Sequence, residues 1–201
     1  MKEEQDYIQD IKEMRTIMER SSKFMSLSGL ASIIAGLYAL AGAFIAWRLF
    51  DFGTPDFYNA PGNLIRVILL ALVVLALSVG TAFLLSRKKA KKRGERVWNA
   101  TSRRLLYTTA VPLITGGLLI LIFLSQSLTG LLIPCSLIFY GLALYNASKL
   151  TYEEVRSLGI IQIILGLLSA WIAGYALIFW ALGFGVVHIV YGIYLHNRYE
   201  R

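Results

Sequence analysis

Long apolar runs alternate with short polar segments along this chain. A bilayer core about 30 Å thick requires roughly 20 apolar residues when they form a helix that rises 1.5 Å per residue. Because the runs are continuous and not alternating, they favour helices over strands, and a helix satisfies its own backbone within lipid. The pattern predicts six spans, at Met25–Leu49, Asn63–Ser86, Leu105–Ser125, Leu128–Ala147, Leu158–Ala173 and Tyr175–Leu195.

The composition supports an integral membrane protein. Hydrophobic residues make up 57% of the chain and charged residues only 16%, whereas a soluble domain has about 25% charged residues. The first apolar run follows a polar segment and is longer than the apolar core of a signal peptide, so we expect it to remain as a membrane helix. The predicted fold class is all-α: a polytopic membrane protein whose six transmembrane helices form three hairpins, plus a cytoplasmic amphipathic helix at the N-terminus.

The distribution of lysine and arginine predicts the orientation. Most of the 20 basic residues fall in the N-terminal segment, in residues 87–104 and after the fourth and sixth spans. Cytoplasmic loops carry an excess of basic residues, so we expect both termini in the cytoplasm. Arg48 and Arg66 alone flank the first outer loop.

The cytoplasmic loop predicted at residues 87–104 is the most basic segment. Each lysine or arginine near an anionic leaflet contributes about 1 kcal/mol of attraction. We therefore predict a topology anchor in contact with anionic lipid headgroups, and the alternative for this loop is a nucleic-acid or acidic protein site. Our prediction for the whole chain is no nucleic-acid partner. The predicted headgroup contacts are Arg87, Lys88, Lys89, Lys91, Lys92 and Arg93.

Three regions are predicted: a cytoplasmic amphipathic helix at residues 1–24, a transmembrane domain at residues 25–197 and a cytoplasmic tail at residues 198–201. In the first, Tyr7, Ile11, Met14 and Met18 are spaced by four, three and four residues, which places them on one helix stripe. This helix either packs on its own loops or, through residues 2–20, pairs with a second copy or binds a cytoplasmic protein.

An internal repeat relates the predicted hairpins. Residues Tyr140–Asn146 match Tyr191–Asn197 at an offset of 51, and residues Pro112–Gly116 match Gln162–Gly166 at an offset of 50. Ser32–Gly36 extends the match to the first hairpin. The three hairpins would share one orientation, unlike the inverted repeats of many carriers. Small residues let membrane helices approach closely, so we predict packing glycines at Gly36, Gly80, Gly116, Gly141, Gly166, Gly185 and Gly192.

The last hairpin, with Gly166-Leu167-Leu168, Gly185 and Tyr191-Gly192, resembles the HdeD-like acid-resistance membrane proteins. The resemblance covers about Met25 to Leu195 and excludes the N-terminal helix, the basic loop and the long first loop. It implies a small, stress-associated protein of the bacterial inner membrane. It supplies no catalytic motif.

His188 is the main candidate for a functional group within the membrane, where polar side chains are costly. It shares a helix face with Gly185 and Gly192, so we expect it inside the bundle. There it is either a neutral imidazole held by a hydrogen bond or a pH sensor, because free imidazole titrates near pH 6.5. Gln162 and Asn146 are predicted to form hydrogen bonds between helices. His188 and His196 lie on one helix and cannot ligate opposite faces of a haem, and we predict no metal and no cofactor.

The spans contain no aspartate or glutamate, and the chain shows no nucleophile–base pair or phosphate-binding loop. We therefore expect a non-enzymatic membrane protein that acts as a scaffold, a sensor or a stress-associated protein. The alternative is a channel or transporter for a small neutral or anionic solute. That alternative rests on the repeat, on Pro112 and Pro134 and on His188, and it predicts a polar cavity at mid-membrane depth.

Overall fold

The computed structural model of this protein describes residues 28–53, 62–92 and 98–199. This part of the chain is all-helical and contains six helices that are long enough and apolar enough to cross a membrane. The predicted N-terminal amphipathic helix lies outside the described residues. The first five spans are built on α2 (Gly29–Leu49), α4 (Asn63–Lys92), α5 (Ala100–Ser125), α6 (Leu132–Ala147) and α7 (Glu154–Trp171).

The sixth helix, called the last span below, changes its geometry along its length. It consists of α8 (Ala176–Trp180), the π-helical segment η4 (Ala181–Val187) and α9 (His188–Tyr199). Short π-helical insertions are rare and are frequently found at functional sites. The 3-10 turns are η1 (Thr129–Leu131), η2 (Ser148–Leu150) and η3 (Ala173–Tyr175).

The helix boundaries correct the predicted basic loop. Residues Arg87–Lys92 form the last turns of α4, and α5 already begins at Ala100. Lysine, arginine and alanine are good helix formers, so the helix continues beyond its apolar part. At Asn99 a capping box starts α5: its side chain accepts a hydrogen bond from the Ser102 backbone N–H at 2.8 Å, and its own N–H donates to Ser102 Oγ at 2.9 Å.

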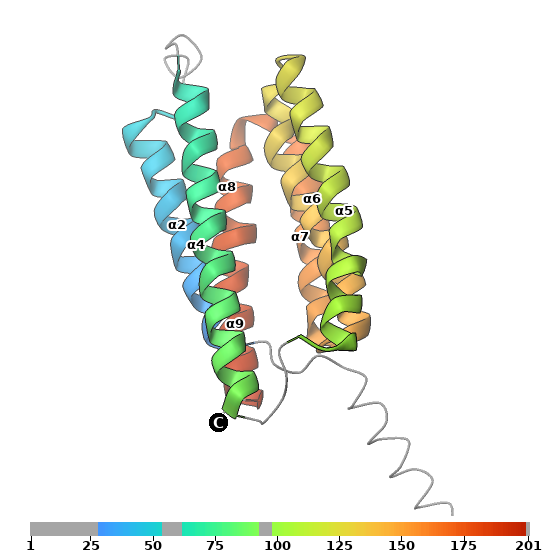
Figure 1. Ribbon diagram of the computed structural model, residues 1–201. Helices are drawn as coiled ribbons and strands as arrows, with labels where there is room; N and C mark the ends of the chain where they lie inside the picture. The colour runs from blue at the N-terminus through green and yellow to red at the C-terminus, as the bar shows by residue number, and fades with distance from the viewer. Residues whose placement is uncertain (1–27, 54–61, 93–97, 200–201) are drawn as a thin grey trace, which may run out of the picture.

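The six helices form two groups of three (Figure 1). The first group contains α2, α4 and the last span, and the second contains α5, α6 and α7. The ends of α4 and α9 and the starts of α2, α5 and α7 lie at one end of the bundle, called the basic end here because Arg87–Lys92 and Arg198 lie there. We predicted that the fifth and sixth spans form one hairpin. In the structure α7 packs against α8 and η4 of the last span, but its main partner is α6, and α9 packs against α2.

Two glycines bring α2 and the last span into backbone contact. A Cβ atom added to Gly29 would lie 2.6 Å from the Gly192 carbonyl oxygen, and one added to Gly192 would lie 2.6 Å from the Gly29 carbonyl oxygen. About two turns further along α2, the space beside Gly36 is filled by Ile189, whose Cγ1 would be 2.7 Å from an added Cβ. Any larger residue at these positions would force the helices apart, as is typical of small-residue packing in membranes.

The interface between α7 and α6 repeats this packing. An added Cβ on Gly159 would lie 2.7 Å from the Gly141 carbonyl oxygen, and one on Gly141 would lie 2.6 Å from the Gly159 carbonyl oxygen. Ile138 fills the space beside Gly166 in the same way, with its Cγ1 at 2.7 Å from an added Cβ. The contacts of α2 recur in α7 at an offset of 130 residues, and those of α6 recur in the last span at an offset of 51.

The remaining glycines differ in their surroundings. A Cβ on Gly116 would meet the Phe139 side chain of α6 at 2.5 Å, and a Cβ on Gly185 would meet Leu40 of α2 at 2.5 Å. Gly80, which we predicted at a packing face, lies in open space, with no atom within 4 Å of an added Cβ. Among the described helices, α4 packs closely against α2 alone, and no close packing joins it to α5.

Candidate functional site

A cavity of about 710 Å³ lies between the two groups of helices. It extends from Phe52 and Leu177 at the far end to Thr151 and Leu195 at the basic end. Most of its lining side chains are apolar. The polar exceptions are hydroxyl groups and His188, and the hydroxyl-bearing lining residues are Ser28, Ser32, Ser78, Ser86, Thr109, Thr129, Ser136, Tyr140, Thr151 and Tyr191.

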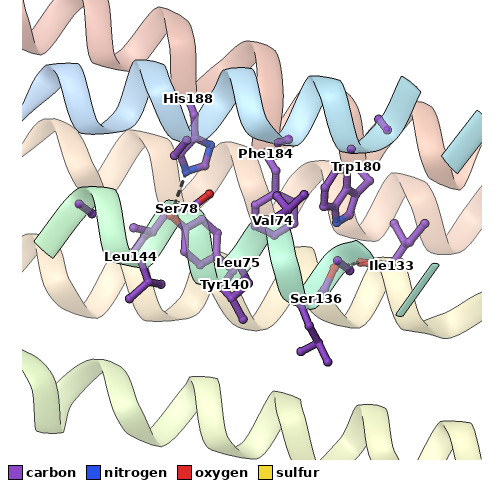
Figure 2. A pocket seen from close by; sticks show the side chains of 18 of the residues that line it. Val74, Leu75, Ser78, Ile133, Ser136, Tyr140, Leu144, Trp180, Phe184 and His188 are labelled. Atoms are coloured by element: carbon purple, nitrogen blue, oxygen red, sulfur yellow. Dashed lines mark hydrogen bonds between the residues drawn. The ribbon is translucent and has the colours of Figure 1, made fainter. Parts of the chain in front are cut away.

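His188 lies in the wall of this cavity and is almost completely buried. Its Nδ1 is 2.9 Å from the Gly183 carbonyl oxygen, and its Nε2 is 2.9 Å from the Tyr140 hydroxyl of α6. A carbonyl oxygen can only accept, so Nδ1 carries the hydrogen. In the neutral imidazole Nε2 then accepts from the Tyr140 hydroxyl, and this hydrogen bond crosses between the two groups (Figure 2).

Gln162 of α7 forms a second polar link between the groups. Its amide Nε2 donates to the same Gly183 carbonyl oxygen at 2.7 Å. From the first group, Ser32 Oγ donates to the His188 carbonyl oxygen at 2.8 Å. Three helices therefore converge on the π-helical segment and on the first residue after it. Within the described residues the Gln162 Oε1 atom is buried and has no hydrogen-bond partner.

Aromatic rings continue the wall of the cavity along the last span. Figure 2 shows His188, Phe184 and Trp180 in a row, with Tyr140 reaching His188 from α6. The Tyr140 and His188 rings are stacked with centroids 5.5 Å apart, and the Trp180 and Phe184 centroids are 5.3 Å apart. On the side of α4, Val74 and its neighbours line the cavity. The centre of the cavity is thus apolar and aromatic, and the hydrogen-bonding atoms of His188 are already occupied.

Polar contacts also join the two groups at the basic end. Glu154 at the start of α7 forms an ion pair with Arg198 of α9 at 3.0 Å and accepts a hydrogen bond from the Tyr199 hydroxyl at 2.9 Å. Ala147, Tyr152, Val155 and Leu195 form an apolar cluster beside this ion pair. The groups are therefore held together at mid-depth and at the basic end, and α8 packs against α6 and α7 at the far end, while no close packing joins α4 to α5 among the described helices.

Two of the three predicted polar residues, His188 and Gln162, lie at the same centre. The third, Asn146, is half-buried near the end of α6 and is not part of it. The tyrosine of this centre, Tyr140, was not singled out from the sequence as a site residue. The sequence nevertheless contains a pattern that could have pointed to Tyr140, because the proposed repeat matches it with Tyr191. Both tyrosines line the cavity.

The predicted headgroup residues Arg87, Lys88, Lys91 and Lys92 are exposed on the last turns of α4. Lys89 is half-buried, and its Nζ lies 5.9 Å from the centre of the Tyr152 ring. Arg93 lies outside the described residues.

Across residues 28–53, 62–92 and 98–199, no three His, Cys, Asp or Glu side chains come together as a metal site would require. The six apolar helices define a multi-pass helical membrane protein. Comparison with family models, curated proteins and solved structures finds no match to this chain.

Proposed function

We propose that this protein is a non-enzymatic membrane protein that binds an acyl chain of a membrane lipid in the cavity between its two groups of helices and acts as a sensor or scaffold. The observation that carries the proposal is the cavity itself, with its apolar and aromatic lining beside Tyr140 and His188. Its volume lies within the range of about 300–1,000 Å³ that is common for ligand sites.

The open side of the cavity supports a ligand that arrives from the bilayer. Close packing joins α4 to α2 and not to α5 among the described helices, so the opening between α4 and α5, called the seam below, faces the surrounding lipid. The apolar walls favour an acyl chain over a hydrated solute, which would lose its water without gaining new hydrogen bonds. This lining favours the binding protein over the channel or transporter alternative.

A sensing role follows from the position of the cavity. It lies between two groups of helices that are joined by polar links, among them the hydrogen bonds from Tyr140 and Gln162, by packing of α8 against α6 and α7 and by the apolar cluster at the basic end. An occupant of the cavity would contact both groups and would therefore bias their separation. The stress-associated role implied by the HdeD-like resemblance stays a prediction, as does binding of a second copy or a cytoplasmic protein through residues 2–20.

We infer a bacterial inner-membrane location with both termini in the cytoplasm, supported by the basic residues gathered at one end of the bundle. A single cysteine placed at Ser127 or at Arg201, in a chain where Cys135 is replaced by serine, tests this orientation. An impermeant thiol reagent added to intact cells should label the first variant and not the second, and the reverse pattern would contradict it.

The repeat of three hairpins is also part of this proposal. Its support is the agreement of two offsets: the glycine contacts between α2 and the last span recur between α7 and α6 with corresponding partners, at 2.6 or 2.7 Å from an added Cβ. In the third hairpin α7 and α9 diverge, so that α7 belongs to the second group of helices and α9 to the first. The cavity lies between these two groups.

Filling the cavity tests lipid binding. The filled variant carries Ala71→Phe and Ser78→Phe, because both residues line the cavity from α4. The control variant carries Ala76→Phe and Gly80→Phe on an exposed face of the same helix. In native mass spectrometry from nanodiscs, the filled variant should lose the lipids that the wild-type and control proteins retain. Equal retention by all three proteins would refute the proposed function.

A further inference from the structure

We propose that the occupant of the cavity is an anionic glycerophospholipid that enters through the seam, with one acyl chain in the cavity and its phosphate at the basic end. This inference rests on the proposed function and names its ligand class. Three independent features carry it: the side chain that holds the seam open, the cations that flank the seam, and an unpaired hydroxyl group between them.

Thr109 keeps the seam open where the repeat would otherwise close it. The offsets of the repeat place Thr109 of α5 in register with Gly29 and Gly159. At those two positions an added Cβ would lie 2.6 Å and 2.7 Å from a carbonyl oxygen of the facing helix. A threonine side chain cannot occupy that space, so α5 cannot approach α4 in the same geometry. Thr109 instead lines the cavity.

The seam is flanked by cations on both helices at the basic end. Arg87 and Lys88 of α4 directly follow Ser86, the last residue of α4 that lines the cavity. Arg103 and Arg104 of α5 directly precede Leu105, the first lining residue of that helix. All four basic side chains are exposed. A phosphate at this mouth would therefore face positive charge from two sides.

The charges around the mouth are compatible with an anion. At the start of α7, Glu154 Oε1 is paired with Arg198 and Tyr199, while Glu154 Oε2 is buried without a hydrogen-bond partner among the described residues. At the far end the described cations near the lining are Arg48 and Arg66, so positive charge is concentrated at the basic end. Juxtamembrane lysine and arginine side chains attract anionic lipid in this way.

Tyr191 supplies a hydrogen-bond donor between the mouth and the apolar centre. It lines the cavity, and its buried hydroxyl has no partner among the described residues. The ester carbonyl groups of a glycerophospholipid lie between its phosphate and its chains and can only accept hydrogen bonds. Such a carbonyl would accept from the Tyr191 hydroxyl while the acyl chain continued past His188 and Phe184.

Lipid retention with varied headgroups tests the inference. Purified protein in nanodiscs is examined by native mass spectrometry with phosphatidylglycerol and phosphatidylcholine of identical chains. We expect wild-type protein to retain phosphatidylglycerol preferentially. Replacing Arg87 and Arg104 by glutamine should lower this preference by up to roughly thirtyfold, since each charge contributes about fivefold. Replacing Arg48 and Arg66 by glutamine is the matched control and should leave it unchanged.

Tyr191→Phe should lower the retention of both lipids by a similar factor, on the order of threefold, because it removes a hydrogen bond to the ester that both lipids share. Equal retention of the two lipids by wild-type protein, with loss of both in the filled variant, would overturn the inference and leave the proposed function standing. Retention that the filled variant does not reduce would overturn both. If the double arginine variant does not fold, Lys88→Gln with Arg103→Gln tests the same charge.

Discussion

Two pairs of membrane helices differ in how closely they pack. Helices α6 and α7 are in close contact, whereas α4 and α5 are separated by the seam. In the first, two glycines place each helix backbone against the carbonyl oxygen of the other, and the same contacts recur between α2 and the last span. In the second, the proposed repeat aligns Thr109 with Gly29 and Gly159, and Thr109 lines a cavity in place of a helix contact. We infer from the comparison that the cavity arises where the proposed repeat of helix packing is interrupted.

The largest effect is expected where a closed interface is forced open. Gly159→Val should destabilise the protein by about 3 kcal/mol, because its Cβ would lie 2.7 Å from the Gly141 carbonyl oxygen, a backbone atom that cannot move alone. Unfolding in detergent, followed by circular dichroism, measures the loss.

The matched control is Gly117→Val, at a helical glycine of α5 with no atom within 4 Å of an added Cβ. It should stay close to wild-type stability. Equal destabilisation by both variants would show that helix propensity, and not the close approach of α6 and α7, explains the result.

A smaller loss of stability is expected when the hydrogen bond between Tyr140 and His188, which links the two groups of helices, is removed. Tyr140→Phe removes the hydroxyl that donates to His188 Nε2 and leaves a buried acceptor without a partner, which costs about 1–3 kcal/mol. The same unfolding measurement applies. Tyr107→Phe, at a side chain that is 70% exposed, should have no effect, and a Tyr140→Phe protein as stable as this control would contradict the assigned link.

Ser32→Ala should cost less still, about 0.6 kcal/mol, which is the average for a hydrogen bond between membrane helices. It removes the donor to the His188 carbonyl oxygen within the first group. Ser125→Ala serves as its control, since among the described residues that hydroxyl donates to the Ile122 carbonyl oxygen of its own helix. A Ser32→Ala loss larger than that of Tyr140→Phe would reverse the proposed ranking of the links.

The smallest change is expected at the seam. Thr109→Gly should let α5 approach α4, shortening the distance between spin labels at Leu84 and Leu106 by an ångström or so, toward the closed packing of small-residue interfaces. Pulsed electron spin resonance in nanodiscs measures this distance. Thr108→Gly is the control: it lowers helix propensity by the same amount, but it should not shorten the distance between the labels. An unchanged distance in Thr109→Gly would mean that the threonine does not hold the seam open.

Much of the fold could be predicted because membrane spans are recognisable in a sequence by their length and apolar composition. The six spans overlap the observed helices, and six of the predicted glycines lie at helix contacts: Gly36, Gly116, Gly141, Gly166, Gly185 and Gly192. Gly80 does not lie at a helix contact. This could not be predicted, because a membrane helix is apolar all round and its sequence does not show which side faces protein. The same ambiguity hid the divergence of α7 from α9.

The candidate site could be predicted only in part. His188 and Gln162 stood out as polar residues in apolar runs, and the structure brings them together at Gly183. The role of Tyr140 depends on its distance to a residue 48 positions later in the chain, which no local pattern encodes. The π-helical segment likewise depends on packing between helices and has no simple signature of spacing.

The most direct test is the quenching of Trp180 fluorescence by lipids brominated on the acyl chain. Trp180 lines the cavity and would be the single tryptophan, with Trp47, Trp98 and Trp171 replaced by phenylalanine. Brominated lipid should quench Trp180 in the otherwise wild-type protein and in the control variant with Ala76→Phe and Gly80→Phe. Quenching should fall in the filled variant with Ala71→Phe and Ser78→Phe. Equal quenching in the filled and control variants, or none in any of them, would contradict an acyl chain in the cavity.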